Sequence, residues 1–274
     1  MSEMVLADTH CHLVLPELAA DLPDVLQRAK DAGVDRLVVP GVDVESSRRA
    51  LELAESRPGV FAAVGIHPHY AGGWSWRAQA ELNALAKSPR VVAIGEIGLD
   101  YYRKLSSRDA QLAAFRAQLD LAGETRRPVI LHSREALRDV FAELDRWLAR
   151  KAGQNGRSPG VLHAFAGDAQ DAQYAIERGI LMGVAGPITY PKSDPLRRVV
   201  AGVPLPSLVV ETDAPYMSPV PYRGKRNEPA HVALVARRLA EVLGLDPALL
   251  SAATSDNAAR LFGWMDEHTN RNVL

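Results

Sequence analysis

Short apolar runs rich in β-branched residues alternate along the chain with longer segments of helical periodicity. The runs begin near Val5, Leu37, Phe61, Val91, Val129, Val161, Ile180 and Leu208. Such alternation is typical of parallel strands joined by crossover helices. Eight strands in 274 residues leave about 34 residues for each strand and helix, which predicts a closed α/β barrel of the (β/α)8, or TIM, type.

Three of the intervening segments show helical periodicity most clearly. Apolar side chains recur every three or four residues in segments 112–122, 137–148 and 232–242, and Ser106 and Ser107 precede the first, where either can cap it. We expect these helices to cover the barrel and a further helix to lie at the C-terminal end. A doubly wound open sheet is the alternative fold, but no G-x-G-x-x-G turn opens the first helix and no P-loop occurs.

The whole chain, residues 1–274, is predicted to form a single domain. Residues 151–159 are the most loop-like stretch, and because they lie between a predicted helix and the sixth strand we interpret them as a surface loop. Lys and Arg total 32 against 33 for Asp and Glu. The resulting net charge of −1 does not by itself indicate a nucleic-acid or membrane partner.

Cysteine usage and hydropathy predict the compartment. The single cysteine excludes an intrachain disulfide and is typical of a reducing environment. No apolar run is long enough to span a bilayer, and the first residues lack the basic and apolar regions of a signal peptide. We therefore expect a cytoplasmic protein without membrane contact, and no obligate protein partner is evident.

Polar residues gather directly after the apolar runs, where a barrel places its active site. These strand ends carry His10, His12, His67, His69, Glu96, His132, Arg134, His163, Glu211 and Asp213. Six of the eight histidines therefore fall at one rim. The two histidines after the first strand are two residues apart in extended chain, so their side chains project to the same side. Cys11 between them points the other way, which favours a packed side chain over a nucleophile.

Imidazoles and carboxylates that converge from five strand ends indicate a metal centre. Such donors suit Zn²⁺ or Mn²⁺, and Mg²⁺ where oxygen ligands dominate. The six candidate ligands are His10, His12, Glu96, His132, His163 and Asp213. Six ligands exceed what one open tetrahedral site takes, so we expect two ions. The ligands of the first and eighth strands should hold one ion, those of the fifth and sixth strands the other, and Glu96 should bridge the two.

Seven short motifs occur in order along the chain. They are residues 8–13 (DTHCHL), 65–69 (GIHPH), 95–102 (GEIGLDYY), 131–134 (LHSR), 163–167 (HAFAG), 211–216 (ETDAPY) and 257–262 (NAARLF). In this combination the chain resembles the TatD-type metal-dependent deoxyribonucleases, a branch of the amidohydrolase-like barrels, nearly from end to end. The family usually has Cys-Phe-Ser-Gly after the histidine of the fifth motif. The Ala-Phe-Ala-Gly found here leaves the ligand in place and puts only local polar contacts in question.

The resemblance implies metal binding by the six ligands named above. It also implies 3′ to 5′ exonuclease action on single-stranded DNA or DNA ends, with RNA as a further substrate class. Our mechanistic hypothesis is that a hydroxide bridging the two ions attacks phosphorus, since metal binding lowers the pKa of water to about 7. Glu96 would fix the spacing of the ions and Asp213 would take a proton, so these two are the predicted catalytic residues.

Rings and positive charges interleave in segments 101–104 and 222–226 on the same rim. Tyr222 and Arg223 are the residues expected to stack on bases and to pair with phosphates, although a solvated basic loop is the alternative for either segment. Arg134 follows a predicted ligand by two residues and is expected to contact a phosphate or the leaving group. His67 is assigned to substrate contact, because the six ligands already fill the two sites.

Two other functions stay open. An amidohydrolase or esterase acting on a small amide or an aminoacyl-tRNA ester could use the same hydroxide to attack carbon. A carboxylated lysine often bridges the metals in such enzymes, and no lysine ends a predicted strand here, which favours Glu96 as the bridge and a phosphodiester as the substrate. A non-catalytic scaffold would have lost ligands, whereas all six are present.

Overall fold

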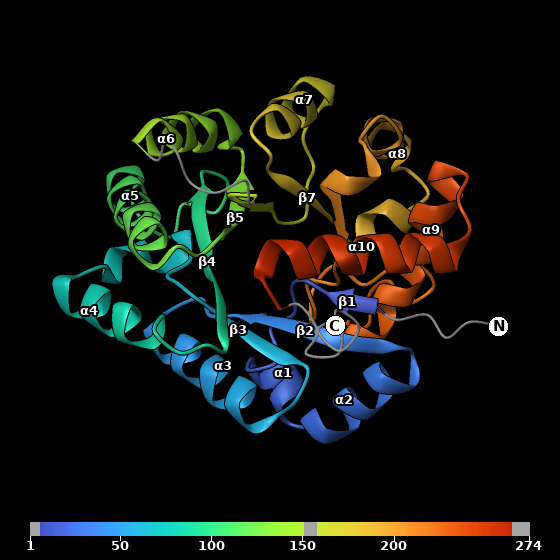
Figure 1. Cartoon of the computed structure of the whole chain (residues 1–274), viewed down its shortest axis with the longest axis horizontal. Coiled ribbons are helices and arrows are strands. Elements are labelled where there is room, and N and C mark those ends of the chain that lie inside the picture. Colours follow the sequence, from blue (N-terminus) through green and yellow to red (C-terminus); the bar gives the residue numbers. More distant parts are fainter. Residues whose placement is uncertain (1–5, 151–157, 265–274) are drawn as a thin grey trace, which may run out of the picture.

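Eight parallel strands lie in chain order around a nearly closed barrel, each paired with the next (Figure 1). The structure is a computed structural model that describes residues 6–150 and 158–264. The strands are β1 (Leu6–Asp8), β2 (Val34–Pro40), β3 (Val60–Val64), β4 (Val91–Asp100), β5 (Val129–Arg134), β6 (Gly160–Leu162), β7 (Leu181–Val184) and β8 (Leu208–Val210). The predicted (β/α)8 barrel is thereby confirmed.

The barrel closes through the segments that follow β1 and β8. Cys11 and Ala214 form a parallel bridge, and the amide of His12 donates to the carbonyl of Ala214 at 2.7 Å. The amide of Asp213 donates to the carbonyl of His10 at 2.9 Å. These backbone bonds join the two segments that carry candidate ligands, so closure of the barrel sets their relative positions.

Helices surround the barrel between successive strands (Figure 1). They are α1 (Pro16–Ala19), α2 (Leu22–Asp31), α3 (Val44–Ser56), α4 (Trp76–Leu85), α5 (Arg108–Thr125), α6 (Leu137–Arg150), α7 (Ala169–Glu177), α8 (Asp194–Ala201), α9 (Val232–Leu243) and α10 (Pro247–Phe262), with short 3₁₀ turns η1 (Pro68–Gly73), η2 (Gly186–Thr189), η3 (Leu205–Ser207) and η4 (Pro229–His231). The three segments predicted from periodicity lie in α5, α6 and α9. Ser107 caps α5 by accepting from the amide of Ala110. No described helix is long and apolar enough to cross a membrane.

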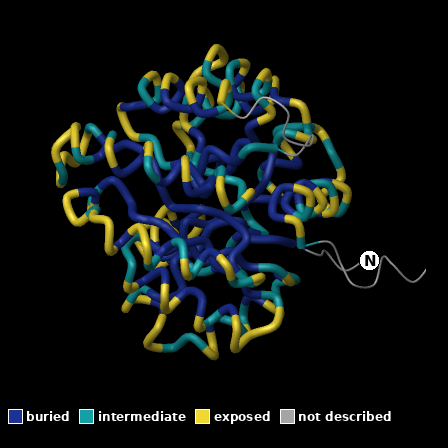
Figure 2. The backbone as a smooth tube through the Cα atoms, turned by 60° about the vertical axis from the view of Figure 1, so that its left-hand side comes forward, coloured by how far each residue is buried: buried dark blue, intermediate teal, exposed yellow. Residues whose placement is uncertain are grey.

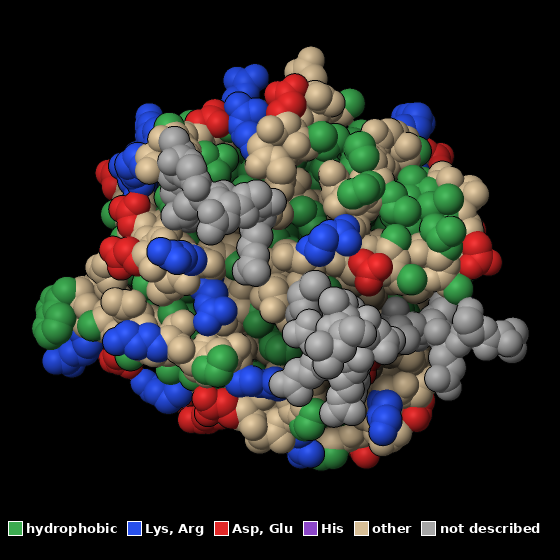
Figure 3. All heavy atoms as spheres, viewed as in Figure 1, with side chains coloured by type: hydrophobic (Ala, Val, Ile, Leu, Met, Phe, Trp, Pro, Cys, Tyr) green, Lys and Arg blue, Asp and Glu red, His purple; other side chains and the backbone are tan. Residues whose placement is uncertain are grey.

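The C-terminal helix α10 covers the end of the barrel where the strands begin. Leu261 and Phe262 belong to an apolar cluster that includes the strand residues Val38 and Ile130. The side chain of Asn257 donates to the carbonyl of Leu208, the first residue of β8, at 2.7 Å. Figure 3 shows the same face as Figure 1, and among its described atoms no histidine is visible. The strand ends that carry the candidate site therefore lie at the other end of the barrel.

Buried backbone fills the middle of the molecule and exposed positions lie around its outside (Figure 2), and most strand residues are buried. All ten residues of β4 are buried. β4 runs on through residues 95–100, which we expected to follow the strand, because its pairing with β5 extends to Asp100 opposite Arg134. β2 likewise begins at Val34, earlier than predicted. Of the predicted surface loop, residues 151–157 lie outside the described residues.

Candidate metal centre

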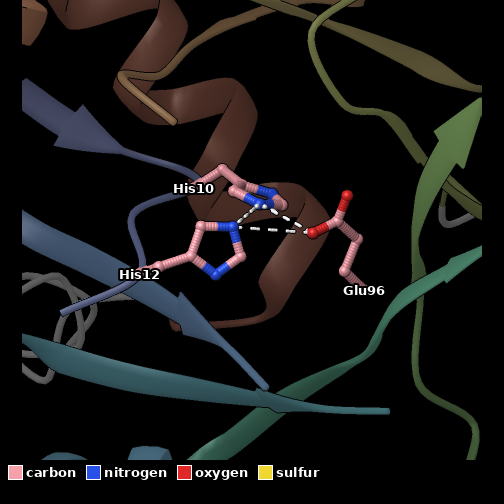
Figure 4. A group of neighbouring side chains, drawn as sticks. All are labelled: His10, His12 and Glu96. Carbon is pink, nitrogen blue, oxygen red and sulfur yellow. Dashed lines mark hydrogen bonds and ion pairs between the residues drawn. The ribbon is translucent and has the colours of Figure 1, made fainter. Parts of the chain in front are cut away.

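Histidine and carboxylate side chains meet where the strands end. Figure 4 shows His10 and His12, from the segment after β1, pointing toward Glu96 of β4. The two histidine Nε2 atoms are 3.2 Å apart, and Oε2 of Glu96 lies 3.3 Å from the first and 3.6 Å from the second. All three side chains are buried. Two imidazole nitrogens at this distance share at most one hydrogen, so the cluster suits a cation.

Asp213 adds a fourth donor to this first cluster. Its Oδ1 lies 3.7 Å from Nε2 of His10 and 3.4 Å from Nε2 of His12. Donors bonded tetrahedrally to one ion at about 2.0–2.2 Å are separated from each other by about 3.3–3.6 Å. The observed spacing of the donors therefore fits a single divalent ion. Asp213 reaches this position with φ at +57°, a conformation that few residues other than glycine adopt and that often marks functional sites.

The other oxygen of Glu96 faces a second cluster. Oε1 lies 2.8 Å from Nδ1 of His132 on β5 and 3.6 Å from Nε2 of His67, which follows β3. His67, Glu96 and His132 form a group whose ligand atoms lie close enough together to hold an ion. One buried carboxylate thus presents an oxygen to each of two sets of histidines, which is the arrangement that a bridging ligand requires.

His163 lies against the first cluster. Its ring stacks on His10 with centroids 3.6 Å apart, and its Nε2 is 3.5 Å from Oδ1 of Asp213. Among the described residues, the three-residue groups able to hold an ion place His163 with His10 and Glu211, and none joins it to His132. The predicted pairing of His132 with His163 on one ion stays a prediction. The amide of His163 donates to the carbonyl of Leu131 on β5, while the side chain of Glu211 accepts from the next amide, that of Ala164.

Glu211 is a buried carboxylate that the sequence patterns placed at the rim without a role. Its Oε1 lies 2.7 Å from Nδ1 of His163 and accepts from the amide of Ala164 at 2.6 Å. Its Oε2 accepts from the hydroxyl of Thr9 at 3.1 Å. Although burial lowers the pKa of His163, the charges of Glu211 and Asp213 raise it to about 10. A carboxylate on the far nitrogen of a histidine orients the ring for metal binding.

Asp100, at the end of β4, supports the second cluster in a similar way. Its Oδ2 lies 2.8 Å from Nε2 of His69 and 3.4 Å from Nε2 of His132. Its Oδ1 accepts from the amides of Tyr102 and Arg103. Burial opposes ionisation, but the hydrogen bonds from His132 and from the Arg103 amide hold the pKa of Asp100 below its usual value. The motif around Glu96 was the only sequence signal for this residue.

Asp8 joins the two segments that close the barrel. Its carboxylate accepts from the hydroxyl and the amide of Thr212 at 2.6 and 2.9 Å, and from the amide of His10 at 3.2 Å. Complete burial raises the pKa of Asp8 to about 7 against these hydrogen bonds. The side chain therefore acts as a clamp between the strand ends that carry His10 and Asp213.

Burial and neighbouring charges shift the pKa values of the cluster in different directions. Burial lowers the pKa of His10 and, more strongly, that of His67. Burial alone would raise the pKa of Glu96 and Asp213, but the neighbouring histidines hold both below their usual values. These four groups are thus in the protonation states that bind metal. Against the effect of burial, however, the neighbouring carboxylates raise the pKa of His132 and His163, which would each release a proton on binding an ion.

The residues expected to contact substrate are placed unequally. Arg134 lines a cleft of about 770 Å³ whose wall also contains His163, and its guanidinium lies 3.9 Å from the ring centroid of Tyr102. Tyr222, by contrast, stacks on His231 with centroids 4.2 Å apart. For Arg223 the described contact is with Tyr190, whose ring centroid is 4.2 Å away. Of the four predicted residues, His67 alone has a described contact with a candidate ligand, namely Glu96.

The chain is similar to proteins named as metal-dependent hydrolases and nucleases. A family model described as TatD related DNase matches residues 7–263. The chain is 37% identical over 258 residues to YabD of Bacillus subtilis, named an uncharacterized metal-dependent hydrolase, with 94% of this chain and 99% of that protein covered. It is 38% identical over 262 residues to the protein named 3′-5′ ssDNA/RNA exonuclease TatD of Citrobacter rodentium, at 93% and 97% coverage. The crystal structure of YjjV, a TatD homolog from Escherichia coli, superposes with a TM-score of 0.88 at 35% identity, covering 94% of this chain and 98% of that one.

Proposed function

Because the chain belongs to the TatD related DNase family and is therefore a metal-dependent hydrolase acting on ester bonds, we propose that it removes nucleotides from the 3′ end of single-stranded DNA. RNA is the second polymer proposed as substrate, since the Citrobacter rodentium relative is named for both. The cytoplasm is the proposed compartment.

The observation that carries the proposal is the placement of Glu96. Its two carboxylate oxygens face different histidine clusters, one around His10 and His12 and the other around His132. A pair of ions bridged in this way suits an in-line displacement at phosphorus, in which the attacking and leaving oxygens both need stabilisation. The bridging position holds a glutamate, and this favours a phosphodiester over the amide or ester substrates considered above.

We propose two divalent ions at this centre, with Zn²⁺, Mn²⁺ or Mg²⁺ as candidates. The proposed ligands, as predicted from the sequence, are His10, His12 and Asp213 for the first ion, His132 and His163 for the second, and Glu96 for both. The assignment of His163 to the second ion rests on the sequence alone, because its described side-chain contacts are with His10, Glu211 and Asp213. When bound, the ions would supply a water of lowered pKa as nucleophile and would stabilise the charge that develops on the phosphate.

The protein side chains would accept the proton and bind the phosphates of the substrate. Glu96 and Asp213 stay ionised in the buried centre because the surrounding histidines lower the pKa of each. Asp213, at the side of the first cluster, is the proposed proton acceptor. Arg134, exposed beside the cleft that reaches His163, is placed to neutralise a phosphate of the strand. Tyr222 and Arg223 would act farther along the strand, since their described contacts are with His231 and Tyr190.

The direct test uses a 5′-labelled single-stranded oligonucleotide. Protein reconstituted in turn with Mg²⁺, Mn²⁺ or Zn²⁺ should give a ladder that shortens from the 3′ end, and EDTA should stop it. A matching RNA oligonucleotide measures the preference between the two polymers, and a circular single-stranded DNA reports any internal cleavage. Absence of cleavage with all three metals, in protein shown to bind metal, would contradict the proposal.

A further inference from the structure

Exposed apolar side chains are concentrated at the end of the barrel that carries the candidate metal centre. Eight of the nine large exposed hydrophobic side chains of the described residues are Tyr70, Trp76, Tyr102, Leu105, Tyr216, Met217, Val220 and Tyr222. They lie in the segments after β3, β4 and β8, or begin the helix that follows. The ninth, Leu249, is on α10, which covers the opposite end. Exposed apolar surface gathered in one place usually marks a binding site.

Tyr216 lies beside the metal ligands, and hydrogen bonds hold its backbone in place. Its ring centroid is 6.2 Å from that of His12, and its amide donates to the carbonyl of Asp213 at 2.8 Å. The side chain of Asn227, which is fully buried, donates to the carbonyl of Tyr216 at 2.6 Å. The residue is nevertheless 51% exposed. A rigid ring beside the reacting centre, with half of its surface open, is suited to bind a flat group.

Tyr70, in the segment after β3, is another exposed tyrosine. It lies in η1, where its amide donates to the carbonyl of His67 at 2.8 Å, and it is also 51% exposed. Tyr70 is therefore a second exposed aromatic ring at this end of the barrel.

We propose that Tyr216 stacks on the base of the 3′-terminal nucleotide. This inference rests on the proposed nuclease function and adds the residue that binds the base. An aromatic face stacks on any base, so such a subsite accepts every sequence. Bases inside a duplex are covered by their neighbours, whereas an unpaired terminal base can turn onto the ring. The subsite would therefore favour frayed or single-stranded ends.

The decisive comparison uses two oligonucleotides that differ only in the terminal base. One is an ordinary single strand, and the other carries an abasic residue at its 3′ end. Stacking on one base corresponds to about a 5- to 150-fold change in binding. We expect the wild-type protein to favour the ordinary strand in kcat/KM within that range. In Tyr216→Ala the preference should fall toward one, whereas Tyr216→Phe should keep it.

Two further variants serve as controls. Tyr216→Leu keeps bulk but lacks an aromatic face, so it should behave like the alanine variant if both fold. Leu249→Ala removes an equally exposed side chain from the opposite end and should change nothing. An unchanged preference in Tyr216→Ala would overturn the inference, and so would an equal loss on both oligonucleotides, because that result would assign Tyr216 to positioning of the metal ligands.

A binding measurement separates this inference from the proposed function. Fluorescence anisotropy with both oligonucleotides in EDTA reports base recognition without catalysis. If the wild type binds the ordinary strand more tightly in a Tyr216-dependent way but cleaves neither, the nuclease proposal is wrong and the base subsite stands. If it cleaves both strands and neither binding nor cleavage depends on Tyr216, the subsite is wrong and the nuclease proposal stands.

Discussion

The Nδ1 atom of His163 lies 2.7 Å from Oε1 of Glu211, and both side chains are buried, at 8% and 1% exposure. The same histidine directs its Nε2 toward Asp213. A carboxylate on one ring nitrogen fixes the tautomer and the orientation of the ring, and it leaves the other nitrogen available for metal. Glu211 therefore affects metal binding by orienting His163.

Replacing Glu211 by glutamine should weaken the metal centre while the fold persists. The amide keeps the shape of the side chain but removes the charge that orients His163. Loss of such a partner typically costs about 10- to 100-fold in metal affinity or activity. Isothermal titration with Mn²⁺ or Zn²⁺ measures the change, and Glu177→Gln, at an exposed site on α7, is the matched control. If Glu211→Gln binds metal as tightly as the wild type, Glu211 does not orient His163 for metal binding.

Glu96→Gln should abolish hydrolysis with the barrel intact. The substitution leaves one oxygen and replaces the other by an amide nitrogen, so one of the two clusters loses its shared ligand. Because metal ions contribute several kcal/mol of transition-state stabilisation, we expect the rate to fall by at least about a hundredfold. Circular dichroism checks the fold, and elemental analysis counts the bound metal. Full turnover in this variant would rule out Glu96 as the bridge.

The fold could be predicted because each buried strand leaves a run of β-branched residues in the sequence. The end of β4 could not, since residues 95–100 contain glycines and charges that resemble a loop. Their strand conformation depends on pairing with β5, up to Asp100 opposite Arg134, and hydropathy does not report that pairing. The C-terminal helix was predicted to exist, but its packing over the end of the barrel required the three-dimensional structure.

The candidate ligands could be predicted from their positions at strand ends, and the period of two in a strand explains why His10 and His12 converge. The sequence could not show which carboxylates bind metal and which hydrogen-bond to a metal-binding histidine. Glu211 and Asp213 are two residues apart, and only the distances to His163 show which nitrogen each one faces. The stacking of Tyr222 on His231, nine residues later, also could not be predicted from rings and charges that are adjacent in the sequence.

A pH-dependent contribution to stability should come from Glu143 on α6, which pairs with Arg116 on α5. Two nitrogens of Arg116 donate to its carboxylate at 2.8 and 2.7 Å, and this hydrogen bonding lowers the pKa of Glu143 below its usual value. A lowered carboxyl pKa stabilises the fold above the unfolded value, and the stabilisation is lost as pH falls through the folded value. Glu143→Gln should therefore cost about 1 kcal/mol at pH 7 and much less near pH 3.

Thermal unfolding of the wild type and Glu143→Gln at the two pH values tests this directly. About 1 kcal/mol corresponds to a difference of a few degrees in Tm for a chain of this size. Arg116→Met removes one partner and leaves Arg146, whose guanidinium lies 2.6 Å from Oε1 of Glu143, so it should show a smaller narrowing of the Tm difference toward low pH. A gap in Tm that stays constant from pH 7 to pH 3 would mean that the ion pair does not contribute.

Arg134→Ala should weaken the binding of single-stranded DNA more than it slows the chemical step. The guanidinium is exposed at the cleft beside His163 and is not among the candidate metal ligands. Removal of one phosphate contact should raise KM and reduce the slope of log affinity against log salt by about 0.7. Arg134→Lys keeps the charge but loses the planar contact with Tyr102, so partial recovery is expected. An unchanged salt slope would show that Arg134 does not bind the strand.

Gly183→Ala should disturb the metal centre without touching any ligand. A Cβ at this buried position of β7 would lie 2.6 Å from Cδ of Glu211. The carboxylate cannot retreat easily, because Thr9 and the amide of Ala164 hold its two oxygens. We expect a loss of about 1–3 kcal/mol in the free energy of unfolding. Metal affinity should also fall by at least about tenfold, as the carboxylate moves away from His163.

The double variant Gly183→Ala with Glu211→Gln shows whether the two changes act on the same contact. If the methyl group weakens metal binding by displacing the carboxylate from His163, little remains to be lost once that carboxylate has become an amide. The effects on metal affinity should then be clearly less than additive, as expected for residues in contact. Additive effects would mean that Gly183→Ala acts through strain in β7 and that the space left by this glycine has no part in orienting the metal ligand.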